Sequence, residues 1–183
     1  MKAAVFFERD GILNLPEIRN GRQRAPLSLS QFRINLEVAP LLRALKEAGF
    51  VLIATTNQPM VEQGLVSRDE VNRMHAMLMR ALPLDDVFMC PYDDASHPCF
   101  KPQPGMLLEA AFKWVIDLNR SYVISDKGAD AKAAQIVGCT SVMVRSDWVG
   151  GDHHDFVVES VAAATGKILE LNQRSFRRDW AIA

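Results

Sequence analysis

The stretch FFERDG, residues 6–11, joins a short apolar run to two carboxylates, Glu8 and Asp10, that are separated by one residue. The apolar run is typical of a strand that is buried on both faces of a parallel sheet. In open parallel sheets, ligands bind beyond the carboxyl ends of the strands, and these carboxylates stand at such an end. The stretch therefore predicts a parallel-sheet fold with a polar site at one edge.

Four further apolar runs rich in Val, Ile and Phe resemble the first and also predict buried strands. The predicted strands cover residues 3–7, 51–55, 87–90, 122–125 and 142–144. Between them, apolar residues at helical spacing predict helices over residues 38–48, 67–78, 107–118 and 129–137. This alternation predicts right-handed crossovers, and hence a doubly wound three-layer α/β/α sandwich with a mostly parallel, Rossmann-like sheet.

Local signals support the ends of three of these helices. Ser67 with Glu70 has the pattern of a capping box, and Gly49 and Gly138 follow the last apolar positions of two helices. The longest stretches without such a pattern are residues 14–31 and 91–105. Because long irregular segments in compact domains are often functional, we expect a lid or a specificity loop there.

Composition narrows the class of protein. The 183 residues are 49% hydrophobic and 23% charged, which suits a single domain over 1–183 with a core that needs no disulfides. A net charge of -1 gives no general attraction to nucleic acid or to anionic membranes, so we expect a small-molecule partner. No apolar run approaches the roughly 18 residues of a membrane span, and charges at residues 8–10 interrupt any signal sequence. We therefore predict a cytoplasmic location.

Polar residues follow each of the first four predicted strands. The carboxylates at 8 and 10 follow the first strand, Thr56 and Asn57 the second, and Lys101 the third. The group after the fourth strand consists of Asp126, Lys127 and Asp130. Oxygen ligands for Mg²⁺, donors for phosphate oxygens and a balancing positive charge are the needs of phosphoryl transfer. The sequence thus predicts a phosphate or magnesium site at this edge of the sheet.

These segments, in this order, resemble the four motifs of the haloacid dehalogenase (HAD) superfamily of phosphatases. The similarity is finest to the cap-less branch that hydrolyses histidinol phosphate and D-glycero-D-manno-heptose 1,7-bisphosphate, which implies that no large cap domain is present. ERDGILN at 8–14, TNQ at 56–58, CPYDDASHPCFKPQPGM at 90–106 and SDKGAD at 125–130 carry the resemblance. It spans residues 1–146 and leaves a predicted C-terminal helix and basic tail at 155–183.

The resemblance implies a two-step hydrolysis through an acyl phosphate. Glu8 stands at the position of the nucleophile, and Asp10 would protonate the leaving sugar oxygen and then activate water. Mg²⁺ would be held by Glu8, by the backbone carbonyl of Asp10 and by Asp126. The implied substrate is a phosphorylated sugar, and the family analogy suggests a monomer.

The remaining site residues have implied roles around the phosphate. Thr56 and the amide of Asn57 would hold phosphate oxygens, and Lys101 would neutralise them. Lys127 and Asp130 would support the site. Transfer of the phosphate to another sugar would use the same residues, so the sequence does not separate it from hydrolysis.

Several positions depart from the family pattern. Glu8 replaces an aspartate and extends the carboxylate by roughly 1.5 Å, about one C–C bond. Ile12 replaces a threonine and Phe100 an arginine. Because misplacement on this scale can reduce the rate on the order of a hundredfold, a second reading stays open. In that reading the protein is catalytically impaired and binds Mg²⁺ with a phosphorylated ligand, or a partner protein, without turnover.

The cysteines and histidines leave two points open. Three cysteines without an export signal predict thiols or metal ligands rather than disulfides. Cys90, His97 and Cys99 offer three ligands for zinc, but their mixed type and changed spacing make a poor cage, and ordinary thiols are the alternative. His75 lies within a predicted helix, where we expect a surface or half-buried residue without a functional role.

Overall fold

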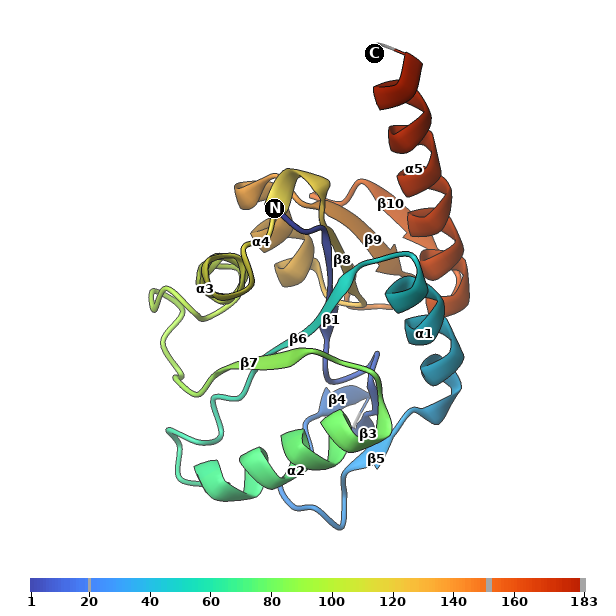
Figure 1. Ribbon diagram of the computed structural model, residues 1–183. Helices are drawn as coiled ribbons and strands as arrows, with labels where there is room; N and C mark the ends of the chain where they lie inside the picture. The colour runs from blue at the N-terminus through green and yellow to red at the C-terminus, as the bar shows by residue number, and fades with distance from the viewer. Residues whose placement is uncertain (20, 151–152, 182–183) are drawn as a thin grey trace.

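The computed structural model describes residues 1–19, 21–150 and 153–181. A six-stranded sheet forms the centre, in the order β10-β9-β8-β1-β6-β7, with every neighbouring pair parallel (Figure 1). The strands are β1 (Ala4–Glu8), β6 (Val51–Asn57), β7 (Asp86–Cys90), β8 (Tyr122–Ser125), β9 (Thr140–Val144) and β10 (Phe156–Val158). The predicted parallel sheet is confirmed, and β10 is an edge strand that the sequence reading missed.

Helices cover both faces of the sheet, which confirms the three-layer sandwich (Figure 1). They are α1 (Ala39–Glu47), α2 (Arg68–Ala81), α3 (Gly105–Trp114), α4 (Gly128–Val137) and α5 (Val161–Ala181), with short 3-10 helices η1 (Leu36–Val38) and η2 (Leu118–Arg120). Among the described residues, no helix has both the length and the apolar character that crossing a membrane requires.

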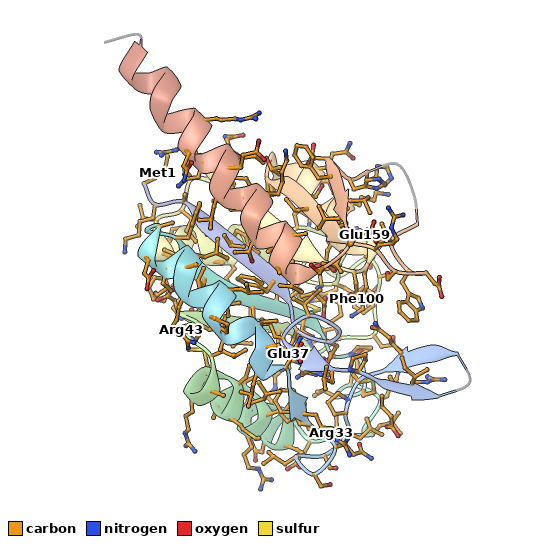
Figure 2. The ribbon with its side chains drawn as sticks, turned by 90° about the vertical axis from the view of Figure 1, so that its right-hand side faces the viewer. Met1, Arg33, Glu37, Arg43, Phe100 and Glu159 are labelled. Carbon is orange, nitrogen blue, oxygen red and sulfur yellow. A yellow bond between two sulfur atoms is a disulfide. The ribbon has the colours of Figure 1, made fainter. Side chains whose placement is uncertain are left out.

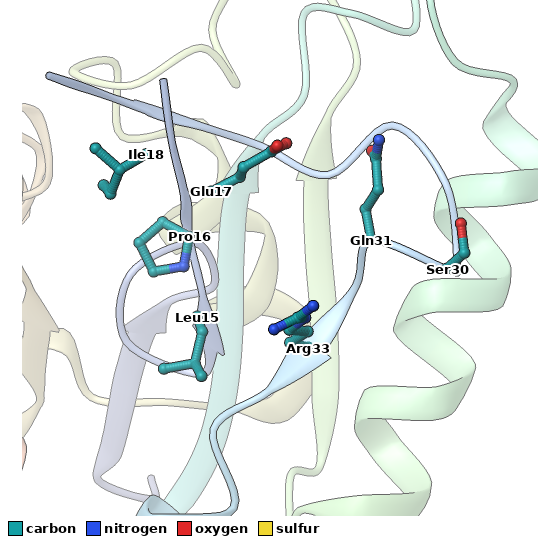
Figure 3. Close-up of a pocket in the computed structure, with 7 residues that line it drawn as sticks. All are labelled: Leu15, Pro16, Glu17, Ile18, Ser30, Gln31 and Arg33. Carbon is teal, nitrogen blue, oxygen red and sulfur yellow. The ribbon is translucent and has the colours of Figure 1, made fainter. Parts of the chain in front are cut away.

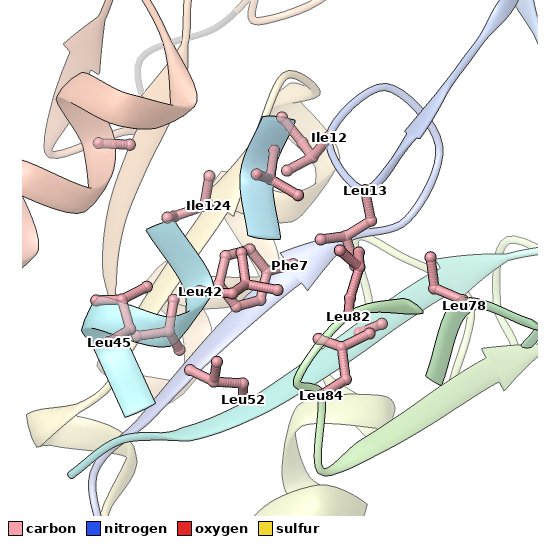
Figure 4. Close-up of a cluster of buried hydrophobic side chains, with 14 of the residues drawn as sticks. Phe7, Ile12, Leu13, Leu42, Leu45, Leu52, Leu78, Leu82, Leu84 and Ile124 are labelled. Carbon is pink, nitrogen blue, oxygen red and sulfur yellow. The ribbon is translucent and has the colours of Figure 1, made fainter. Parts of the chain in front are cut away.

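The two faces of β1 enter two different hydrophobic cores. Val5 and Phe7 pack with apolar residues of α1, α2 and α5, whereas Ala4 and Phe6 pack with those of α3 and α4. Figure 4 shows the first cluster, where side chains from α1, β1 and β6 meet. Alternate residues of a strand point to opposite faces, so a strand apolar at every position is buried on both sides. This packing fixes β1, and therefore Glu8 at its end, in the middle of the molecule.

The order of the strands creates the site. The chain runs from β1 to β6 and β7 on one side, and then returns to β8, β9 and β10 on the other side of β1. The carboxyl ends of β1, β6 and β8 therefore meet at the point where the order reverses, which is where ligands bind in such sheets. Buried polar residues end these strands, including Glu8, Thr56, Ser125 and Asp126.

The helix signals are confirmed in part. Ser67 caps α2 by accepting a hydrogen bond from the backbone N–H of Glu70, and Gly138 ends α4 in the left-handed conformation. The helix expected over 107–118 is shorter than predicted, because Val115 adopts a φ of 55° and ends α3 after Trp114. The C-terminal segment expected from residue 155 first forms β10, and α5 begins only at Val161.

The stretch between β1 and α1, predicted to be irregular, contains short antiparallel pairings. β3 (Glu17–Arg19) pairs with β4 (Arg22–Arg24), and β2 (Asn14–Leu15) pairs with β5 (Arg33–Ile34). We call the β3–β4 hairpin the flap, and Figure 2 shows it projecting from the body of the protein. The insertion in the described chain is thus a pair of small ribbons, in agreement with the expected lack of a large cap domain.

Candidate active site

Glu8 ends β1 with a side chain that is only 3% exposed. Its Oε2 pairs with the Nζ of Lys101, and its Oε1 accepts a hydrogen bond from the backbone N–H of Asp10 at 3.2 Å. The Nζ of Lys127 lies 3.5 Å from the same Oε1. Burial raises the pKa of Glu8, but the ammonium groups of Lys101 and Lys127 lower it more, to about 2. Glu8 is therefore an ionised carboxylate at neutral pH.

Lys101 links Glu8 to a second buried carboxylate. Its Nζ donates to Asp130 Oδ1 at 2.7 Å and to the carbonyl oxygen of Thr55 at 3.3 Å. Burial lowers the pKa of Lys101, but Asp130 and Glu8 raise it above its usual range. The pKa of Asp130 rises to about 6, chiefly because of burial and also because of the charge on Glu8. The side chain of Asn57 holds the peptide of Lys101 through its Oδ1 at 3.1 Å and its Nδ2 at 3.2 Å.

Asp10 is the second residue after β1, and its carboxylate accepts hydrogen bonds from three side chains. Arg9 Nη2 donates to both carboxylate oxygens at 3.0 Å, and Arg9 Nε donates to Oδ1 at 3.2 Å. Gln58 Nε2 donates to Oδ2 at 2.7 Å, and the hydroxyl of Thr56 lies 3.4 Å from the same oxygen. The carboxylate is therefore held at both of its oxygens.

Asp126 follows β8 and faces the loop after β1. A Cβ at Gly11 would lie 2.6 Å from Asp126 Oδ2, and Gly11 has a φ of +106°, so both contact and conformation require glycine. Gln23 of the flap donates to Asp126 Oδ2 at 2.7 Å. The other oxygen, Oδ1, is buried and has no hydrogen-bond partner among the described residues. Burial raises the pKa of Asp126.

Lys127 places a positive charge among the oxygens that the sequence predicted as Mg²⁺ ligands. Its Nζ donates to the backbone carbonyl oxygen of Asp10 at 2.7 Å and lies beside Glu8. Burial lowers the pKa of Lys127, but Glu8, Asp10 and Asp126 raise it above its usual range. These oxygens already bind a cationic group, the ammonium of Lys127, and Oδ1 of Asp126 has no partner among the described residues. We call this set of oxygens the cation cradle. The donor set consists of oxygens only, which fits Mg²⁺.

A separate cavity of about 440 Å³ opens beside the base of the flap (Figure 3). It lies between β2 and β3 on one side and the approach to β5 on the other. Its lining mixes apolar, amide, hydroxyl and charged groups from Leu15, Pro16, Glu17, Ile18, Ser30, Gln31 and Arg33. The strand β2 begins at the buried Asn14, which forms a bridge with Asp10. The next residue, Leu15, lines the cavity.

Comparisons with known proteins agree with this geometry. A family model described as HAD-hydrolase-like matches residues 98–164. The D-glycero-β-D-manno-heptose-1,7-bisphosphate 7-phosphatase of Rhodopseudomonas palustris is 32% identical over 150 residues, which are 75% of this chain and 80% of that protein. The protein of the same name from Escherichia coli is 30% identical over 161 residues, 78% of this chain and 79% of the relative.

A solved structure extends the agreement to the fold. The D,D-heptose 1,7-bisphosphate phosphatase from B. bronchiseptica, complexed with magnesium and phosphate, matches with a TM-score of 0.79 at 26% identity. The match covers 93% of this chain and 99% of that chain. The chain belongs to the HAD phosphatase family. The resemblance drawn from the four motifs is thereby confirmed.

The structure of this HAD phosphatase brings the predicted residues of the sheet edge together. Lys101 touches Glu8 and Asp130, and Lys127 touches Glu8 and the backbone of Asp10. Two contacts differ from the implied roles. The hydroxyl of Thr56 faces Asp10 and accepts a hydrogen bond from Gln58 at 2.8 Å, and the side chain of Asn57 is engaged by the peptide of Lys101. Phosphate binding by these two residues stays a prediction.

Four residues of the site were missed by sequence reading. Arg9 and Gln58 hold Asp10, Gln23 reaches Asp126 from the flap, and His75 contacts Arg9 from α2. Gln58 stood inside the quoted TNQ motif, and Arg9 stood between the two carboxylates, so adjacency was an available signal for both. Gln23 and His75 come from distant segments and offered no local signal.

The prediction of unpaired thiols in the cysteine loop is wrong for this structure, because Cys90 and Cys99 form a disulfide. Their Cα atoms lie 5.3 Å apart, within the usual span of such a bond. His97 Nδ1 lies 3.0 Å from the sulfur of Cys99, and its ring stacks on Tyr92 with centroids 4.0 Å apart. The three predicted ligand atoms lie within 4.8 Å of one another, but zinc binds thiolates rather than disulfide sulfurs. Zinc therefore stays a prediction for the reduced loop alone.

Proposed function

We propose that this chain is a Mg²⁺-dependent phosphatase that hydrolyses the phosphate monoester of a sugar phosphate, with Glu8 as the nucleophile. The observation that carries the proposal is the convergence of two carboxylates and a backbone carbonyl oxygen with two lysine ammoniums at one edge of the sheet. D-glycero-D-manno-heptose 1,7-bisphosphate is the first candidate substrate, because the relatives carry that name.

Glu8, the backbone carbonyl of Asp10 and Asp126 would hold the metal ion. The Lys127 ammonium lies 2.7 Å from the carbonyl oxygen of Asp10 and 3.5 Å from Glu8 Oε1, and the unpartnered Oδ1 of Asp126 supplies a further acceptor. When bound, Mg²⁺ would neutralise charge on the phosphate and orient it.

In the first chemical step, an oxygen of the ionised Glu8 carboxylate forms a bond to phosphorus. The bond between phosphorus and the sugar oxygen breaks, and that oxygen takes a proton from Asp10. Lys101 already lies against Glu8 and would stabilise the negative charge that gathers on the phosphate oxygens. The product of this step is a glutamyl phosphate and a free sugar hydroxyl.

In the second step, Asp10 accepts a proton from water while the water oxygen bonds to phosphorus. The bond between phosphorus and the Glu8 oxygen breaks, and its electron pair returns to the carboxylate. Inorganic phosphate leaves, and Asp10 carries the proton needed for the next cycle. The hydrogen bonds that Asp10 accepts from Arg9 and Gln58 hold it in one orientation for both transfers.

A second candidate function rests on the contact between Glu8 and Lys101. The extra methylene of Glu8 lets its carboxylate pair directly with the ammonium that the phosphate would need. In this alternative the chain binds Mg²⁺ and a phosphorylated ligand, or a partner protein, without turnover. Single-domain organisation over 1–183, a cytoplasmic location and a monomeric state stay predictions from composition and analogy.

The deciding experiment measures phosphate release from a panel of sugar phosphates with Mg²⁺, for the parent chain and for Glu8→Asp, Glu8→Gln and Asp10→Asn. We expect turnover by the parent, and its loss in Glu8→Gln and Asp10→Asn. Release of inorganic phosphate also separates hydrolysis from transfer to a second sugar. A silent parent together with an active Glu8→Asp variant would support the binding alternative instead.

A further inference from the structure

We propose that Arg9 and His75 are positioning residues for Asp10, forming a clamp that fixes the carboxylate of the proton-transferring group from helix α2. The inference rests on the proposed function, in which Asp10 gives and takes protons. It assigns a role to a histidine that the sequence indicated as a bystander, and to an arginine buried between two predicted catalytic carboxylates.

Arg9 is the first part of the clamp. Its side chain is fully buried, at 0% exposure, although arginine is rarely buried without a specific partner. The guanidinium donates to both oxygens of Asp10, and its planar fork allows only one relative orientation of the two groups. The ring of Phe32 covers it with a centroid 5.4 Å from Cζ. Arg9 therefore restricts rotation of the Asp10 carboxylate.

His75 is the second part, and it anchors the guanidinium from the opposite side. Its Nε2 lies 3.1 Å from Arg9 Nη1. Because a guanidinium can only donate hydrogen bonds, Nε2 must be the acceptor, and the neutral imidazole must carry its proton on Nδ1. Burial and the charge of Arg9 lower the pKa of His75 to about 4, so the acceptor form persists at neutral pH.

The chain of contacts runs from α2 to the site without a break. His75 lies next to Met74, whose side chain is buried in the hydrophobic core, so the position of the helix fixes the position of the imidazole. The imidazole fixes Arg9, and Arg9 fixes both oxygens of Asp10. A neutral acceptor at position 75 satisfies the buried Nη1 without placing a second positive charge beside the guanidinium of Arg9.

The test compares two leaving groups in kcat/KM, which reports the steps up to departure of the leaving group. A sugar oxygen needs a proton as it leaves, whereas p-nitrophenolate does not. We expect His75→Leu to lower kcat/KM roughly tenfold for the sugar phosphate, and less than about twofold for p-nitrophenyl phosphate. His75→Gln, whose amide oxygen can accept from Arg9, should recover most of the loss. An equal loss with both substrates, or no recovery in His75→Gln, would overturn the clamp.

Met79→Gln serves as the matched control, because Met79 lies one turn further along the same helix and packs against the core, with no described contact to Arg9. We expect it to change stability and to leave the ratio of the two kcat/KM values unchanged. The free energy of unfolding of each variant, from urea titration, identifies losses that come only from destabilisation.

A measurement without turnover separates this inference from the proposed function. In the full chain at pH 7, ¹⁵N NMR of the imidazoles should show His75 neutral with an unprotonated Nε2, assigned by the signal that His75→Gln removes. If the parent releases no phosphate and this tautomer is present, the clamp stands and the proposed function fails. A protonated Nε2 would overturn the clamp whatever the activity.

Discussion

Two regions at the carboxyl edge of the sheet, the ends of β1 and β8 and the loop after β7, are built in opposite ways. At the ends of β1 and β8, buried carboxylates and lysines pair with one another, and Glu8 alone has contacts to two ammoniums. At the end of β7, the loop of residues 91–99 carries exposed groups such as Tyr92, at 39% exposure, and is held by a disulfide and a ring stack. The first region is a buried network of ion pairs, whereas the second is a partly exposed loop held by local contacts among its own side chains.

Departures from the family pattern occur in both regions. Phe100 replaces an arginine just beyond the loop, and Glu8 replaces an aspartate within the paired region. There the longer side chain of Glu8 contacts Lys101 and Lys127 directly. Mutations that remove one member of each region test this contrast.

The largest effect is expected for Lys101→Met. It removes the ammonium from two buried carboxylates, Glu8 and Asp130, and breaking a buried ion pair in this way costs about 3–5 kcal/mol. Urea titration measures the free energy of unfolding. Lys113→Met is the control, because Lys113 is 59% exposed and its pair with Asp86 contributes less than about 1 kcal/mol. Similar losses in both variants would contradict the contrast.

The next effect is expected for Gly11→Ala, which adds a methyl group against Asp126 and forces alanine into a φ of +106°. We expect a loss of about 3 kcal/mol in unfolding free energy and weaker Mg²⁺ binding by calorimetry. Gly64→Ala is a matched control, since Gly64 also has a positive φ, +70°, but no atom within 4 Å of the added Cβ. It should lose stability and keep its Mg²⁺ affinity. Unchanged Mg²⁺ affinity in Gly11→Ala would show that the contact between position 11 and Asp126 does not affect cation binding.

A smaller effect concerns pH. The pKa of His75 is lowered from 6.5 to about 4 on folding, so between these values the unfolded chain binds a proton that the folded chain does not. The stability contributed by neutral His75 is complete above pH 6.5 and is lost as the pH falls toward 4, by about 3 kcal/mol. The difference between the parent and His75→Gln in urea titrations at several pH values isolates this contribution. A difference that does not change with pH would show that the pKa of His75 does not change on folding.

The smallest effect is expected in the loop. Tyr92→Ala removes the stack on His97, which is partly exposed, and should reduce the unfolding free energy by about 0.5 kcal/mol. Phosphate release should be unchanged, because Tyr92 has no described contact with the carboxylates at β1 and β8. A loss of activity as large as that of Glu8→Gln would show that the loop takes part in the reaction, and it would contradict the contrast between the two regions.

The sequence predicted the parts of the fold that depend on strong local pattern. β1, β6 and β8 each begin with a run of apolar residues that is buried on both faces, and this pattern needs no knowledge of the rest of the chain. β10 was missed because its three residues are only half-buried, and the flap was missed because its strands are short and polar. The end of α3 depends on the backbone of Val115, a residue type that rarely adopts a positive φ.

The site residues likewise fall into a predictable and an unpredictable group. Residues at strand ends were predicted because topology brings the carboxyl ends of parallel strands together. His75 and Gln23 could not be predicted, since each reaches the site from another element through a single tertiary contact. The disulfide was not predicted because a cytoplasmic location was expected, where cysteines are usually reduced. Whether two sulfurs meet depends instead on the fold of the loop.

The pairing of β1 on both of its sides determines how the extra length of Glu8 can be absorbed. Residues 4–8 are in register with β6, and residues 5–7 with β8, so the main chain cannot retreat from the site without breaking two ladders. The additional side-chain length of roughly 1.5 Å must then displace the carboxylate away from the sheet, because the main chain cannot move back. A phosphoryl group in line with this carboxylate would have to sit correspondingly farther from the sheet. The length of the side chain at position 8 thus determines how deeply a substrate can enter the site.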